Sequence, residues 1–146
     1  MIAAPLWVAY EANLGTLLRT CDAVGACLAV PNTAHYRGAL ARGDTLARRP
    51  HIHWLDRTKL VWLRAERARG SRILAVELAD GATPLTRLAP ARQRSVVLLG
   101  HERNGVPEEA WNCIDEVLEI PMVGLGASLN VAVAGSLVLY RLAGLM

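Results

Sequence analysis

The sequence lacks the features that would mark a secreted, fibrous or metal-dependent protein. Its 146 residues include only three cysteines, Cys21, Cys27 and Cys113, an odd number without the spacing of a metal-binding motif. Residues 1–5 carry no basic side chain that would begin a signal peptide. We find no internal repeat and no low-complexity segment. These absences exclude a disulfide scaffold and a fibrous repeat, and they predict reduced thiols, a cytoplasmic location and no metal site.

A membrane-spanning segment is also missing, although one stretch has the length for it. The 21 residues between Glu119 and Arg141 carry no charge. The first half of this stretch holds residues that are typical of a loop leading into a helix cap, namely Pro121, Gly124, Gly126, Ser128 and Asn130. The uniformly apolar part, residues 131–140, has about half the length of a membrane span. We therefore expect a buried C-terminal helix and no membrane partner.

The chain has enough apolar residues to bury the core of one domain. Hydrophobic residues make up 53% and charged residues 20%, which rules out a disordered chain. Residue patterns predict strands at residues 6–10, 27–30, 51–55, 73–78, 95–99 and 117–120, and helices at 14–24, 38–48, 59–69 and 128–145. This alternation predicts a single α/β domain over residues 1–146, with a mostly parallel sheet and helices on both faces.

Positive charge is concentrated in one quarter of the chain. The net charge is +3, and every basic residue except Lys59 is an arginine. Ten basic and three acidic residues lie from Arg37 to Arg72, so this stretch alone carries +7. Arginine forks match phosphate oxygens bidentately, so the stretch either faces a polyanion or forms a solvated helical face.

Three segments that follow predicted strands contain unusual residues, at the edge where parallel sheets bind ligands. In the first, residues 11–19, Asn13 is the predicted N-cap of a helix and Gly15 permits a close approach. Arg19 lies on that helix among apolar residues, where it either is paired or points into a site, or extends to solvent along an apolar stem.

The second segment, residues 100–105, places Gly100 and Gly105 around Glu102, which can accept hydrogen bonds from amides or hydroxyls. It is either a ligand-binding loop or an ordinary strand-to-helix loop, and it lacks the Gly-Lys-Ser of a phosphate-binding Walker motif. In the third segment, residues 120–130, Ser128 and Asn130 lie before an apolar helix, where they either hold a part-polar ligand or cap the helix. The residues alone thus predict a glycine-lined apolar cleft with a basic flank.

The three segments together resemble the SpoU/TrmH family of SPOUT-class RNA methyltransferases. The resemblance rests on N-x-G-x-x-x-R-T at residues 13–20, G-x-E-x-x-G at residues 100–105, and I-P-M with S-L-N-x-A-x-A at residues 120–134. It implies a SPOUT fold with a deep C-terminal trefoil knot, and a homodimer. It also implies methyl transfer from S-adenosyl-L-methionine (SAM) to a ribose 2′-hydroxyl of tRNA or rRNA.

The resemblance also assigns site residues. The catalytic set is Arg19, Asn13, Glu102, Ser128 and Asn130. The cofactor-binding set is Glu77, Gly100, Ile120, Met122, Ser128 and Leu129. The family proposal makes the arginine a general base, but a guanidinium hardly deprotonates in proteins. Arg19 therefore either removes the proton or holds a phosphate and stabilises the developing alkoxide.

Many relatives carry an N-terminal RNA-binding extension, and we expect none here because the first predicted strand begins at about residue 6. RNA binding is then assigned to the domain itself, through Arg37, Arg42, Arg48, Arg49 and Arg57. Trp54 and Trp62 either stack on bases or belong to the core. Two alternatives stay open: a methyltransferase of the same fold that acts on a small molecule, and a non-catalytic RNA-binding relative.

Overall fold

The computed structural model describes residues 1–146 and contains one seven-stranded sheet. The elements in chain order are β1 (Ile2–Ala4), α1 (Glu11–Val24), β2 (Cys27–Pro31), α2 (Ala34–Gly43), β3 (Ile52–Leu55), α3 (Lys59–Ala68), β4 (Arg72–Val76), β5 (Thr83–Pro84), η1 (Leu85–Arg87), β6 (Ser95–Leu98), η2 (Glu108–Cys113), β7 (Glu116–Glu119) and α4 (Val131–Leu142). The strand order is β3-β2-β1-β6-β4-β7-β5, and every neighbouring pair is parallel. The predicted α/β class with a parallel sheet is confirmed.

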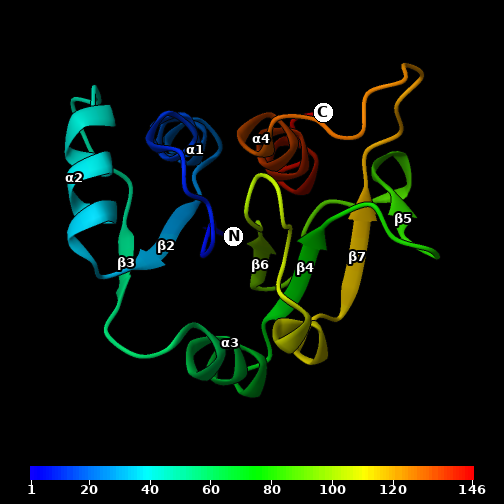
Figure 1. The fold of residues 1–146 in the computed structure, drawn as a ribbon, viewed down its shortest axis with the longest axis horizontal. Helices are drawn as coiled ribbons and strands as arrows, with labels where there is room; N and C mark the ends of the chain where they lie inside the picture. The colour runs from blue at the N-terminus through cyan, green and yellow to red at the C-terminus, as the bar shows by residue number, and fades with distance from the viewer.

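Helices cover both faces of the sheet, as predicted. Figure 1 shows α1, α2 and α4 on one face, with α3 and η2 on the other. A core of 22 buried residues lies under the first group and one of 13 lies under the second. The four residues of β6 are all buried because its two faces contact different cores, which explains why it reads as a continuous apolar run.

The first strand was predicted in the wrong place. Residues 6–10 do not form a strand; β1 is Ile2–Ala4, which pairs with both β2 and β6. Pro5 follows it directly and offers no N–H to a sheet. Residues 6–10 instead form the β1–α1 loop, in which every residue except Tyr10 is buried or half-buried. The apolar pattern of these residues reflects their burial in the loop and not pairing in the sheet.

Three helix starts also differ from prediction. Helix α1 begins at Glu11 with Tyr10 at its N-cap, so Asn13 is a helical residue and not the cap, and residues 11–19 are not a loop. Helix α2 spans Ala34–Gly43 instead of 38–48, because the Thr33 hydroxyl caps it by accepting from the Tyr36 N–H. Helix α4 begins at Val131 and is capped by Asn130, which leaves Ser128 in the preceding loop.

Close packing of α1 on α2 explains Gly15. A Cβ atom on Gly43 would lie 2.8 Å from the Cα of Gly15, and one on Gly15 would lie 3.2 Å from the Cα of Gly43. The close approach that the sequence predicted at Gly15 is therefore one between two helices.

Because all strands run in parallel, their carboxyl ends lie along one edge of the sheet. The β1–α1 loop and the segments that follow β6, β4 and β7 therefore meet at this edge. No helix has the length and apolar character needed to cross a membrane.

Candidate active site

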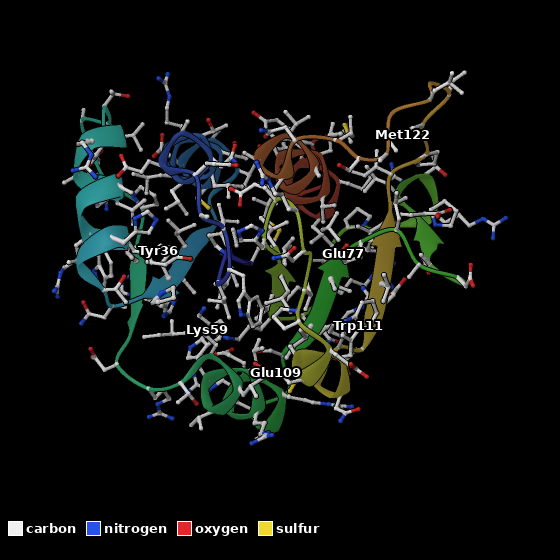
Figure 2. The ribbon with its side chains drawn as sticks, in the orientation of Figure 1. Tyr36, Lys59, Glu77, Glu109, Trp111 and Met122 are labelled. Atoms are coloured by element: carbon white, nitrogen blue, oxygen red, sulfur yellow. The ribbon has the colours of Figure 1, made fainter.

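A cavity of about 290 Å³ lies at the carboxyl ends of β6, β4 and β7, and we call it the β6–β4 cavity. Its walls include all six residues predicted to hold the cofactor: Glu77, Gly100, Ile120, Met122, Ser128 and Leu129. Figure 2 labels Glu77, which follows β4, and Met122, which follows β7. Segments that lie far apart in the sequence thus converge on one hollow.

The two glycines of the second motif close a tight turn beside this cavity. The backbones of His101 and Gly105 exchange two hydrogen bonds of 3.0 and 2.9 Å. A Cβ on Gly100 would lie 2.2 Å from the carbonyl carbon of Gly105, a distance that no side chain tolerates. Gly105 has a φ of +69°, which strongly favours glycine. The spacing of five residues is therefore required by the turn itself.

Glu77 supports this turn from the end of β4. Its Oε1 accepts a hydrogen bond of 2.7 Å from the Val106 N–H. Burial raises the pKa of Glu77, and the hydrogen bond opposes part of that shift. A carboxyl group with a raised pKa at the wall of a cavity suits a ligand that brings hydroxyls or positive charge.

The three motifs are joined by a chain of side-chain hydrogen bonds. Glu102 Oε1 accepts from the Asn13 amide at 2.9 Å, and Asn13 Oδ1 accepts from the Asn130 amide at 2.9 Å. Asn130 Oδ1 in turn accepts from the N–H groups of Ala132 and Val133 at the start of α4. Asn13 is the centre of this chain and is only 6% exposed.

Glu102 also fixes the loop that leads into α1. Its two oxygens accept from the N–H groups of Ala9 and Tyr10 at 3.0 and 2.9 Å. Burial by itself would raise the pKa of Glu102, but these bonds and the Asn13 amide outweigh it, and the pKa is lowered. Glu102 is therefore a carboxylate at neutral pH, which accepts hydrogen bonds and orients the β1–α1 loop.

Tyr36 completes this arrangement and was not predicted from the sequence. Its hydroxyl lies 2.8 Å from the Val8 carbonyl oxygen and 3.2 Å from that of Leu6, so it donates into the β1–α1 loop. Burial, and secondarily the charge of Glu102, raises the pKa of Tyr36 to about 12, which keeps the donor protonated. No local pattern marks this role, because its partners lie 28 and 30 residues away.

Arg19 lies outside the β6–β4 cavity of its own chain. It is exposed on α1 and makes no hydrogen bond or ion pair, so of the three alternatives for its side chain, pairing within the chain is excluded. It lines a separate hollow together with Gly15, Thr16, Arg42 and Gly43. Asn13, Glu102 and Asn130 come together at one place, Ser128 lies on the wall of the cavity, and Arg19 stands apart.

Of the five arginines predicted to bind RNA, three have a side-chain partner and two do not. Arg42 is paired with Glu11, Arg49 with Asp44, and Arg37 donates to the Asn32 side chain. Arg48 and Arg57 are exposed and have no such partner. Trp54 and Trp62 are half-buried and pack against the two cores, which favours the core interpretation for both.

A parallel α/β domain with a cavity at its carboxyl edge, where apolar walls carry a few polar groups, is a ligand-binding domain of the doubly wound class. The model of the SpoU rRNA methylase family matches residues 7–140, and the chain belongs to this family.

One relative and two solved structures show the extent of the similarity. The chain is 31% identical over 135 residues to a tRNA (guanosine(18)-2′-O)-methyltransferase of Escherichia coli, covering 88% of this chain and 56% of that protein. An AdoMet-bound rRNA methyltransferase from Sinorhizobium meliloti superposes with a TM-score of 0.82 at 26% identity, over 99% of this chain and 56% of that one. A structure described as giving insight into 2-OH methylation of C/U34 on tRNA has a TM-score of 0.75 and 29% identity, over 97% and 93% of the two chains.

Proposed function

We propose that the protein transfers a methyl group from SAM to a ribose 2′-hydroxyl of tRNA or rRNA. The observation that carries this proposal is the meeting of the three motifs: the chain Glu102–Asn13–Asn130 lies beside a cavity lined by all six residues assigned to the cofactor. The names of the relatives support the reaction. The chain spans only about half the length of the first of them, so the substrate and partners are part of the proposal.

The β6–β4 cavity fits SAM by its chemistry. Ile120, Leu118 and Val131 supply apolar wall, while Glu77 and Glu102 supply carboxylates. Such a lining suits a molecule that combines an apolar base and an aliphatic chain with hydroxyls and positive charge. When bound, SAM supplies the sulfonium methyl that is transferred. The residues that would hold it are Glu77, Gly100, Ile120, Met122, Ser128 and Leu129.

The chain of hydrogen bonds gives the other motif residues their roles. Glu102 holds the β1–α1 loop, Asn13 joins that loop to Asn130, and Asn130 sets the start of α4 against the cavity. These three orient the site and move no proton. Because Arg19 lies outside the cavity of its own chain, we propose that it serves the cavity of a partner subunit, where it holds a phosphate of the RNA and stabilises the developing alkoxide.

We extend the proposal to a homodimer. Helix α4 and the loop before it expose apolar side chains at positions 129, 133 and 140, and the chain ends with exposed apolar residues: Leu129, Val133, Tyr140, Leu145 and Met146. An exposed apolar stripe on one helix is typical of an interface between subunits. Light scattering on the purified protein tests this, and a monomer at micromolar concentration would contradict it.

Two further features belong to the proposal. Membership of the family supports a deep trefoil knot formed by the C-terminal segment. The three cysteines are unpaired, which supports a reducing, cytoplasmic location.

The experiment that tests the function is methyl transfer from labelled SAM to total tRNA and to rRNA separately, followed by nuclease digestion. We expect label in a 2′-O-methylnucleoside from one pool. The similarity to the C/U34 structure, which extends over nearly the whole of both chains, favours tRNA. Absence of label from both pools, with SAM still bound, would overturn the RNA substrate and favour a small-molecule acceptor. Absence of SAM binding would overturn the cofactor.

A further inference from the structure

A second hollow lies next to the β6–β4 cavity along the same edge of the sheet. One cavity of about 520 Å³ lies between the β1–α1 loop and the starts of α2 and α3, and another of about 650 Å³ lies after β2 and β3. Both are lined by Trp7 and Lys59, so the two cavities adjoin each other, and we call them together the Trp7 groove. Gly105 lines both this groove and the β6–β4 cavity. The groove and the proposed cofactor site therefore adjoin at the Gly100–Gly105 turn.

Sheet order sets the distance between the two hollows. The Trp7 groove lies at the ends of β3, β2 and β1, and the β6–β4 cavity lies at the ends of β6, β4 and β7. Strands are spaced about 4.8 Å apart, so β1 and β4, with β6 between them, lie on the order of 10 Å apart. A chain-like substrate whose reacting unit lies at the cavity has its neighbouring unit at the groove.

The wall of the groove combines an aromatic ring with positive charge. Trp7 is half-buried, and the Lys59 Nζ lies 5.2 Å from the centre of its ring. Arg57 lines the same groove, is exposed and has no ion pair. An indole beside two cations is a combination that binds single-stranded nucleic acid, with a base on the ring and a phosphate on the cations.

His101 supplies a directed donor between the two hollows. Its Nδ1 accepts from the N–H groups of Arg103 and Asn104 at 3.1 and 3.4 Å. In the neutral ring the proton must then be on Nε2, so that this nitrogen is a donor. His101 lines the groove, and its neighbours Gly100 and Glu102 line the β6–β4 cavity.

Acidic residues limit what the groove can bind. Asp56 and Glu109 also line it, and Figure 2 shows Glu109 on the same side of the molecule as Lys59. Asp56 is occupied by the Asn32 amide at 2.6 Å. With two cations and two carboxylates the groove is nearly neutral, so it does not suit the backbone of a duplex. It suits one nucleotide, held by stacking and by a single phosphate.

We propose that the Trp7 groove binds the nucleotide next to the one that is methylated, with its base stacked on Trp7 and its phosphate on Lys59 and Arg57. His101 Nε2 donates to the same nucleotide or to the phosphate between the two. This inference rests on the proposed function, because it requires RNA as the substrate. It adds a specificity site, since the groove discriminates between sequences that flank the target.

The test compares variants in RNA binding, SAM binding and turnover. Trp7→Leu removes the stacking ring and retains apolar volume, Trp7→Phe keeps an aromatic ring, and Lys59→Gln removes one charge. The matched control is Arg92→Gln, an equal loss of charge at an exposed residue that precedes β6, at the opposite edge of the sheet. RNA affinity is measured by fluorescence anisotropy with a labelled tRNA transcript, and SAM affinity by calorimetry.

We expect Trp7→Leu to weaken RNA binding by about fivefold to a hundredfold, the range for one base–aromatic stack. Trp7→Phe retains most of the RNA affinity. Lys59→Gln makes the plot of log K against log salt less steep, by the amount expected for the loss of about one phosphate contact. All variants keep the wild-type Kd for SAM. Equal RNA affinities for Trp7→Leu and Arg92→Gln would overturn the proposal, and so would a parallel loss of SAM binding.

The two proposals fail in different ways. A wild-type protein that binds tRNA but transfers no methyl group to tRNA or rRNA contradicts the proposed function, while the binding data on Trp7 and Lys59 still decide whether the groove binds RNA. A wild-type protein that methylates RNA, with no difference among the Trp7 variants, contradicts only the groove. A wild-type protein that binds no RNA contradicts both.

Discussion

Removing the Asn13 side chain is the sharpest test of how the site is held together. Asn13→Ala deletes the hydrogen bond to the Glu102 carboxylate and the one from the Asn130 amide, each 2.9 Å long. A hydrogen bond to a charged group contributes about 1.5–3 kcal/mol and a neutral one about 0.5–1.5 kcal/mol. We therefore expect the free energy of unfolding to fall by roughly 2–4 kcal/mol, a large part of the total for a domain of this size.

The same substitution should lower Tm by roughly 6–15 °C, measured by calorimetry or circular dichroism at pH 7. Asn112→Ala is the matched control, because Asn112 is exposed and its side chain makes no hydrogen bond. Asn13→Asp adds a second carboxylate beside Glu102 and should destabilise the fold more than alanine does at pH 7. Acidification that protonates one of the pair should relieve this difference. An Asn13→Ala protein as stable as Asn112→Ala would refute the network.

Four further predictions follow from the site. Arg19→Ala should abolish methyl transfer while the Kd for SAM stays unchanged, because Arg19 does not line the cavity; equal loss of both would contradict its assignment. Because the pKa of Glu102 is lowered by folding, its contribution to stability is present above the unfolded value of 4.5 and is lost as the pH falls through the folded pKa; Glu102→Gln should flatten the acid limb of a stability–pH curve. Gly105→Ala, at a φ of +69° with its Cβ 2.5 Å from Glu77 Oε1, should weaken SAM binding and destabilise the fold by more than Gly81→Ala, where the φ is +77° but the space is open. RNA affinity should fall steeply with salt, and a flat response in a titration from 50 to 200 mM would leave the basic stretch as a solvated face.

The net charge of the stretch from Arg37 to Arg72 is larger than the positive charge that remains unpaired and can contact a polyanion. Arg42 and Arg49 are paired with nearby carboxylates, and Arg72 is paired with Glu116 across two strands. A count along the sequence includes these charges, although in the folded protein each of them is paired with a carboxylate. The unpaired Arg57 and the Lys59 beside Trp7 define a smaller surface, and Lys59 also lines the cavity that shares Gly105 with the proposed cofactor site.

The class of fold and the residues that line the β6–β4 cavity were predictable from the sequence. Strands buried on both faces, such as Ser95–Leu98, are apolar throughout, so their alternation with helices is visible without coordinates. The spacing of Gly100 and Gly105 is equally local, because one tight turn requires both. Features that depend only on neighbouring residues were therefore predictable.

Which of these residues contact one another depends on the tertiary structure. Asn13 follows a plausible cap pattern, but its partners lie 89 and 117 residues away, and the parallel sheet brings them to one edge. Strand β1 is short and was misplaced, because its position depends on pairing with β2 and β6 on either side. Trp7 meets Lys59 because the segments that follow β1 and β3 lie at the same edge of the sheet. Contacts across the sheet are set by the order of its strands, which no local pattern in the sequence specifies.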